Sequence, residues 1–387
     1  MRKPFESLLL VLCLGWSIPL AAQTPCPSLS VVVNTPEDQL MLAINGAEKP
    51  EDQIAALDKF TQAHPDSKFM PCVNEYYTST YLKLNNFDKA IEYGEKDVAA
   101  NYADLNLAVN LLKAYVGSGK ASDAAFVLIA KAPELIKAET VPSRSAKATD
   151  DEWKKEQQES GELAKQHRGF MEYAFFQLLP RTTDPKKRLG YLDAFAKAYP
   201  DTPNVSQLNF QYFIAYEMAG DAAKADEYGE KAIAADPNNI EALNLVAYDY
   251  SMGRRTNPEK AAVYAKKVVT LVPSVKKPDG VSDEQFKAQQ NGQLGMAHLV
   301  LGYANLLKAG KTHRAGPAVT DLKAASELLS ANPQLQGQAY YFLGYAYEEN
   351  YPANHRAAAD ALTRSAALNS PMQAQARELL TKVKAAR

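Results

Sequence analysis

The sequence predicts an all-α protein, an α-solenoid built from antiparallel helix hairpins, and three observations support this fold class. The pentapeptide EYGEK occurs at residues 92–96 and again at 227–231, an offset of 135 residues. Pro200, Pro237 and Pro273 lie 37 and 36 residues apart, and each closes an alanine-rich amphipathic segment. Apolar residues recur at helical spacing, without the strict alternation of half-buried strands.

The N-terminal residues 1–22 indicate a secretory signal peptide. Arg2 and Lys3 precede an apolar run over residues 8–20, which ends in Ala21 and Ala22. The run is shorter than the roughly 20 apolar residues that a membrane-spanning helix needs, and no second long run follows it. We therefore expect cleavage after residue 22 and a periplasmic or secreted protein without a membrane span.

Cleavage would remove Cys13 and leave two cysteines, Cys26 and Cys72, in an oxidising compartment. They could form one disulfide, which would stabilise the fold by up to about 4 kcal/mol in the chain-entropy model. Because spacing alone does not show proximity, the alternative of two separate thiols stays open.

The EYGEK repeat belongs to a longer internal duplication. Residues 50–100 match residues 185–235 at 19 of 51 positions without a gap. Within the match, Leu57, Phe60 and Ala63 lie three residues apart, on one face of a helix that the following proline ends. The chain therefore contains a duplicated array of helix pairs.

Several segments of the C-terminal half share a motif. GDAAKADEYGEKAIAADPNN at 220–239 has the pattern of a second helix and exit turn, while EALNLVAYDY at 241–250, AHLVLGYANL at 297–306 and AYYFLGYAYEE at 339–349 have that of a first helix. These segments resemble the tetratricopeptide repeat family, whose motif is W-x2-L-G-x2-Y, then A-x3-F, then P. The matching positions are Val246, Ala247, Tyr250, Leu301, Gly302, Leu343, Gly344, Tyr347, Ala225 and Pro237. The resemblance covers most of residues 35–386 and is loose between 104 and 180.

The duplicated hairpins depart from this motif. Thr78 and Phe213 stand where the family has a small residue, and Gly94 and Gly229 stand in its aromatic place, one position after a tyrosine. Glycine inside a helix costs about 1 kcal/mol relative to alanine, so we expect a packing reason for it in both copies. Within EYGEK we expect the tyrosine to pack, the glycine to let a neighbouring helix approach, and the Glu and Lys residues to form a solvated face.

About eight helix pairs and a terminal helix are expected along the chain. Start signals are Thr35–Pro36, Asp184–Pro185 and Asn257–Pro258, and capping boxes are Thr149–Glu152 and Ser282–Gln285. The polar stretch from Lys131 to Asp150 predicts an inserted loop, followed by a long helix from Asp150 to Leu179. The expected segments are a signal peptide (1–22), N-terminal helix pairs (23–136), loop and long helix (137–184), duplicated pairs (185–275), and C-terminal pairs with a capping helix (276–387).

No motif for catalysis, a cofactor or a metal is predicted. The five histidines are scattered, without a metal-ligand spacing: His64, His167, His298, His313 and His355. AGKTH at 309–313 and GSGK at 117–120 lack the strand and the earlier glycine of a phosphate-binding loop. The net charge is −2 and no Lys/Arg block is present, which argues against nucleic-acid binding.

The resemblance implies a non-enzymatic scaffold that binds a protein or peptide in a concave groove. Tyr248, Tyr303 and Tyr345 each follow the small residue of a first helix, and in the resembled family that side of the helix lines the groove. Such tyrosines could equally be core residues, so both interpretations stay open. An alternative function is a cell-envelope glycan-binding protein, because the 21 tyrosines offer rings for stacking on sugars. An enzyme with a site assembled from dispersed residues is the least favoured hypothesis.

Overall fold

The computed structural model describes residues 32–100, 104–140, 144, 148–253, 256–310 and 313–385. These residues form 17 α-helices and two short 3-10 helices, η1 (Leu179–Arg181) and η2 (Val272–Ser274), and they contain no strand. The all-α, solenoid-like fold class and the expected number of helices are therefore confirmed. The predicted signal peptide and Cys26 lie outside the described residues.

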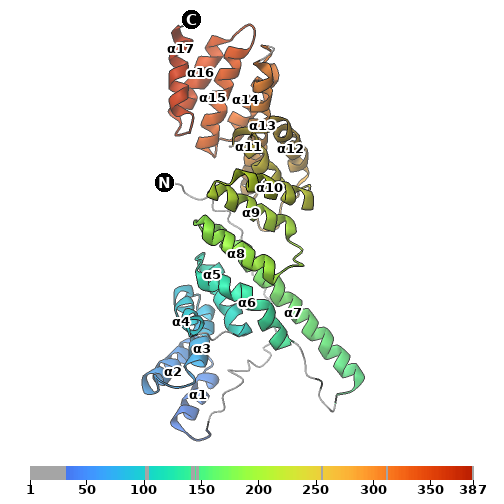
Figure 1. Ribbon diagram of the computed structural model, residues 1–387. Coiled ribbons are helices and arrows are strands. Elements are labelled where there is room, and N and C mark those ends of the chain that lie inside the picture. The colour runs from blue at the N-terminus through green and yellow to red at the C-terminus, as the bar shows by residue number, and fades with distance from the viewer. Residues whose placement is uncertain are drawn as a thin grey trace. The chain divides into compact units, whose positions relative to one another are not determined.

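The chain divides into an N-terminal unit that ends at Thr202 and a C-terminal unit that begins at Pro203, a boundary inside the predicted segment 185–275 (Figure 1). The N-terminal unit contains α1 (Pro36–Gly46), α2 (Pro50–Ala63), α3 (Met70–Lys83), α4 (Phe87–Ala99), α5 (Leu105–Ser118), α6 (Asp123–Thr140), α7 (Asp150–Leu178) and α8 (Pro185–Ala198). The C-terminal unit contains α9 (Val205–Ala219), α10 (Ala222–Ala235), α11 (Ile240–Met252), α12 (Pro258–Leu271), α13 (Asp283–Ala309), α14 (Gly316–Leu328), α15 (Pro333–Glu349), α16 (His355–Ala367) and α17 (Gln373–Ala385).

The expected helix starts are confirmed. Thr35, Asp184 and Asn257 each accept a hydrogen bond from a backbone N–H of the first helical turn, and a proline follows each of them. The capping boxes at Thr149 and Ser282 are both complete, with side chain and backbone bonded in both directions. They begin α7 and α13, the two longest helices, and the predicted long helix from residue 150 is confirmed.

The inserted loop begins later than predicted. The prediction of a loop from Lys131 was wrong for its first ten residues, because α6 continues to Thr140 with Pro133 inside it. The apolar residues Ile129, Ala132 and Ile136 are buried along one face of this helix, and their burial outweighs the proline.

Tyr199 supplies the hydrogen bond that Pro133 removes. A proline has no N–H, so the carbonyl four residues earlier, that of Ile129, loses its helical donor. The buried Tyr199 hydroxyl donates to the Ile129 carbonyl oxygen at 2.9 Å, from a position 70 residues further along the chain. A tertiary contact therefore allows α6 to pass through the proline without an unsatisfied carbonyl.

Replacing Tyr199 with phenylalanine is expected to lower the free energy of unfolding by about 1–3 kcal/mol, because the buried Ile129 carbonyl would lose its donor. In a Pro133→Ala background the same change should cost less, since the alanine would restore a backbone N–H that can bond to this carbonyl. A double-mutant cycle by denaturant unfolding measures the difference. Equal costs in the two backgrounds would contradict this account.

Both copies of EYGEK hold a stack of three tyrosines. In α4, the Tyr93 ring lies 4.1 Å from the Tyr77 ring and 5.8 Å from the Tyr81 ring between centroids. In α10, the ring of Tyr228 stacks in the same way on Tyr212 and Tyr216 of α9. The final lysine of each pentapeptide covers its tyrosine, with Nζ at 4.1 Å (Lys96) and 4.4 Å (Lys231) from the ring centroid. The duplication thus preserves a packing unit as well as a sequence.

At both duplicated glycines, Gly94 and Gly229, side chains of neighbouring helices approach closely, as predicted. A Cβ atom added to Gly94 would lie 2.9 Å from Leu111 Cδ1, and one added to Gly229 would lie 2.8 Å from Val246 Cγ2 and 3.3 Å from Phe213 Cδ2. Gly229 therefore makes room for the bulky Phe213 on the first helix of its hairpin. In the later hairpins the small residue is on the first helix instead, where Gly302 faces a leucine of the second helix.

The second glutamate of EYGEK does not belong to a fully solvated face, and that expectation was wrong. The partly buried Glu95 accepts a hydrogen bond from the Tyr115 hydroxyl of α5. Glu230 accepts one from the Tyr250 hydroxyl of α11 at 2.7 Å. Because Tyr115 and Tyr250 are buried on the following hairpin, each glutamate connects two consecutive hairpins. The first glutamate of each copy pairs with lysine at the surface, as expected, and Glu230 also forms an ion pair with Lys260 of α12 at 2.8 Å.

Candidate partner-binding face

The C-terminal unit has an inner face formed by its first helices. We call α9, α11, α13 and α15 the first helices of four hairpins, and α10, α12, α14 and α16 the second helices. Within the part that the structure describes, α11 packs against α13 and α13 against α15, whereas the second helices show no comparable packing against one another. An array whose first helices are closer together curves toward them, so their side is concave.

Three rows of side chains cross the inner face. On α11, α13 and α15, residues four apart or seven apart fall on the same side of the helix. The rows are Glu241, Met296 and Gln338; Tyr248, Tyr303 and Tyr345; and Met252, Leu307 and Glu349. Gln338 connects these rows, because its Oε1 accepts from the Tyr248 hydroxyl at 3.0 Å and its Nε2 donates to Met252 Sδ at 3.0 Å.

The structure places the three predicted tyrosines in different environments. The Tyr248 hydroxyl is bonded to Gln338, and burial raises its pKa. The ring of Tyr303 packs on Phe342, with centroids 4.8 Å apart. Tyr345 is 39% exposed. Tyr248 and Tyr303 therefore take part in packing between hairpins, while the Tyr345 side chain is partly exposed to solvent. A role of any of the three in binding stays a prediction.

Sequence reasoning did not single out the other members of the rows. Leu307 is 45% exposed, one helical turn after Tyr303, and Tyr345 on the next first helix is 39% exposed, so both present apolar surface to solvent. Glu241 and Glu349 are the charged members of the three rows. The four- and seven-residue spacings from the tyrosines could have found all of them.

Glu241 is an exposed carboxylate at the start of α11. It is the second residue of α11, and it forms no ion pair with any described residue. Desolvation by the surrounding protein raises its pKa, although water reaches the side chain. Glu349 lies near Tyr345, whose pKa is raised by burial and by this carboxylate. The inner face is therefore apolar and aromatic with negative charge at its ends.

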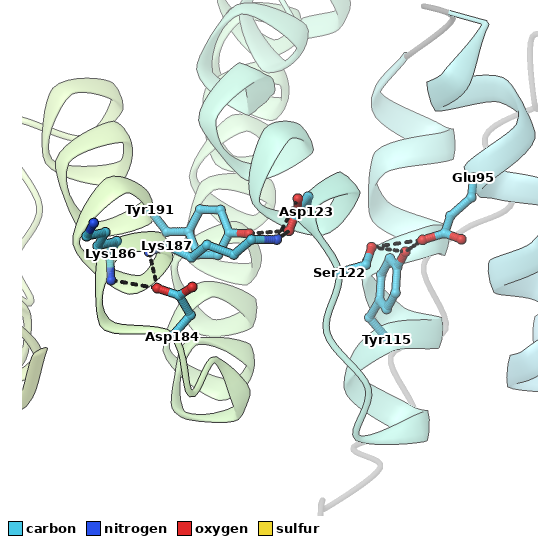
Figure 2. Close-up of polar contacts among 8 residues, drawn as sticks. All are labelled: Glu95, Tyr115, Ser122, Asp123, Asp184, Lys186, Lys187 and Tyr191. Atoms are coloured by element: carbon cyan, nitrogen blue, oxygen red, sulfur yellow. Dashed lines mark hydrogen bonds and ion pairs between the residues drawn. The ribbon is translucent and has the colours of Figure 1, made fainter. Parts of the chain in front are cut away.

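A polar cluster in the N-terminal unit has a structural role (Figure 2). The Ser122 hydroxyl donates to Glu95 at 2.8 Å, beside the Tyr115 contact described above. The next residue, Asp123, accepts from Lys187 Nζ at 2.9 Å and from the Tyr191 hydroxyl, which together lower its pKa. These contacts join α4, α5 and the start of α6 to α8. Because each carboxylate is already occupied by donors of the chain, the cluster offers little to a ligand.

The N-terminal unit also contains a buried carboxyl group, that of Asp97 on α4. Its Oδ1 accepts from Asn74 Nδ2 at 2.8 Å, while its Oδ2 is buried without a hydrogen-bond partner among the described residues. Burial raises the pKa of Asp97 to about 7. The duplicated position in α10 is Ala232, so this carboxyl is absent from the second copy.

The remaining sequence expectations concern metal binding, membrane spans and the cysteine pair. No group of three or more potential metal-ligating side chains is present among the described residues. His298 and His355 instead lie 3.0 Å and 2.9 Å from the carboxylates of Asp321 and Glu348. None of the described helices combines the length and apolar character needed to cross a membrane. Cys72 is buried in α3, and its pairing with Cys26 stays a prediction.

An open hollow lies at the turn between α15 and α16. It has a volume of about 710 Å³ and is lined by Gly316, Val319, Tyr347, Asn350, Pro352, Ala353, Asn354, His355 and Arg356. Its wall is the turn between α15 and α16, and the neighbouring Tyr351 is 86% exposed. The hollow combines polar groups with aromatic rings, but it lies outside the rows of the inner face.

Comparisons with known proteins add no relative: no protein-family model matches the chain, and no curated protein matches it significantly. The description of the inner face therefore rests on the geometry of this chain alone.

Proposed function

We propose that this chain is a non-enzymatic scaffold of the tetratricopeptide repeat type that acts in the periplasm or after secretion. It binds a protein or an extended peptide along the inner face of its C-terminal unit. The observation that carries the proposal is the uncovered apolar surface of Leu307 and Tyr345 on consecutive first helices whose other sides are packed. Apolar and aromatic anchors of this kind dominate binding energy in protein interfaces.

The repeated hairpins support the same proposal. Stacked repeats present side chains at regular intervals along a concave surface, which suits a ligand that is itself extended. The resemblance of the first helices to the family motif supports a scaffold of the tetratricopeptide repeat type. The signal-like N-terminus supports a location in the periplasm or outside the cell.

Peptide binding is expected to depend on the exposed anchors. The purified protein would be incubated with an array of random twelve-residue peptides, and the bound peptides would be titrated by fluorescence anisotropy. Leu307→Ala with Tyr345→Ala should weaken binding roughly tenfold or more, because each anchor is worth about 1 kcal/mol or more. Val263→Ala, at an exposed apolar residue of the second helix α12, should leave binding unchanged.

Two results would contradict this proposal. One is an array with no bound peptide, and the other is equal weakening by both variants. Far-UV circular dichroism and the unfolding midpoint would show that the variants remain folded.

Glycan binding is the alternative, and the hollow beside Tyr351 favours it. A ring that is 86% exposed next to asparagine and histidine side chains could stack on a sugar while the polar groups bond its hydroxyls. Calorimetric titration with soluble cell-wall polysaccharide fragments separates the two functions. Tyr351→Ala should abolish glycan binding and leave peptide binding unchanged.

A further inference from the structure

The inner face carries charge of one sign. The first helices α9, α11 and α15 contain no lysine or arginine, whereas their acidic residues are Glu217, Glu241, Asp249, Glu348 and Glu349. In α13, both lysines, Lys287 and Lys308, lie outside the three rows. The second helices, by contrast, carry eight basic residues: Lys224, Lys231, Lys260, Lys266, Lys267, Lys323, Arg356 and Arg364.

Burial of the first helices does not explain this separation. Desolvation costs free energy for either sign of charge, so it would remove glutamate as well as lysine. The chain as a whole has 43 basic and 45 acidic residues, so a general shortage of lysine is not the cause either. Only basic residues are missing from α9, α11 and α15, while Glu241 remains, exposed at the start of α11.

Acceptor atoms without donors lie on the same helix. Asn244 Oδ1 and Ser251 Oγ of α11 are buried and have no hydrogen-bond partner among the described residues. The two side chains are 4% and 1% exposed, and they flank Tyr248 at distances of four and three residues in sequence. The amide of Asn244 donates to the Gln293 carbonyl of α13, which places this side of α11 toward the other first helices. The exposed and partly exposed carboxylates of the first helices, rather than these buried atoms, give the surface a negative potential that favours a positively charged group.

We propose that the occupant of the inner face is an extended peptide segment that carries lysine or arginine opposite Glu241 and an apolar or aromatic residue against Leu307 and Tyr345. This inference rests on the proposed scaffold function. The Glu241 carboxylate is exposed and forms no ion pair with a described residue, so a lysine or arginine of the peptide can form a charge-assisted hydrogen bond with it.

The test compares two glutamates in the same helical position. Glu241 is the second residue of α11, and Glu259 is the second residue of α12, exposed on a second helix. For bound peptides that contain lysine or arginine, Glu241→Gln should weaken binding roughly tenfold in the anisotropy titration and reduce its dependence on salt. Glu259→Gln should change neither. Glu241→Lys should reverse the preference of the array toward acidic peptides.

The outcomes separate this inference from the scaffold function. Enrichment of lysine and arginine among the bound peptides, lost in Glu241→Gln, supports both. Bound peptides without enrichment of basic residues, or binding that is insensitive to Glu241→Gln, would contradict the inferred lysine or arginine of the peptide. Neither result would contradict the proposed scaffold function. An array without any bound peptide overturns both.

Discussion

Replacing Asp97 with asparagine is expected to stabilise the N-terminal unit above pH 7 and to remove part of its pH dependence. The folded-state pKa of about 7 lies above the ordinary aspartate value of 3.8, so the folded state binds the proton more strongly than the unfolded state. The stabilisation of the protonated group is complete below pH 3.8. It is lost as the pH rises toward 7, where the buried carboxyl must ionise.

The size of this effect follows from the difference between the two pKa values, which corresponds to about 4 kcal/mol. Asparagine keeps an oxygen for Asn74 and carries no charge, so Asp97→Asn should unfold at a similar denaturant concentration at pH 8 and at pH 5. Denaturant unfolding at several pH values would show it. Asp88→Asn on the exposed side of the same helix is the control and should leave the pH dependence intact. A variant with the parent's pH profile would contradict the role of Asp97.

Gly229→Leu is expected to lower the free energy of unfolding of the C-terminal unit by about 1–3 kcal/mol. The added side chain would enter space held by Val246 and Phe213, so these side chains would have to leave their packing positions. Because each hairpin contacts mainly its neighbours, hydrogen exchange should increase in α9 to α11 and change little in α15 to α17.

Gly292→Leu is the matched control within the same unit. Gly292 also lies inside a helix, α13, but a Cβ atom added there would have no neighbour within 4 Å. That substitution should leave the unfolding midpoint unchanged or raise it, because leucine is a better helix former than glycine. Equal midpoints for Gly229→Leu and the parent protein would mean that the duplicated glycine has no packing role.

The helix starts were predictable because their causes are local. The capping box at Ser282 needs only residues within one turn, and the same is true of Thr149. Pro133 shows the limit of such rules. By local chemistry it should end α6, and the hydroxyl that compensates for it belongs to Tyr199, far along the chain.

The candidate face was predictable only in part. The spacing after each small residue predicted one shared position for Tyr248, Tyr303 and Tyr345, and the three residues do lie in the first helices α11, α13 and α15. It did not show that the Tyr248 hydroxyl donates a hydrogen bond to Gln338, 90 residues away, while the Tyr345 side chain is partly exposed to solvent. Burial at each position depends on the neighbouring hairpins, and hairpin spacing is set by tertiary packing rather than by the helix period.

The two copies of EYGEK have equivalent neighbours, which bears on how the length of this chain can change. A recombination between their coding sequences would delete 135 residues and leave one intact copy. The joined helix would still offer its tyrosine to Tyr77 and Tyr81, its glycine to Val246 and its second glutamate to Tyr250. The reverse exchange would insert the same 135 residues. Such a gene can therefore gain or lose three hairpins in one event while these contacts of the joined helix are kept.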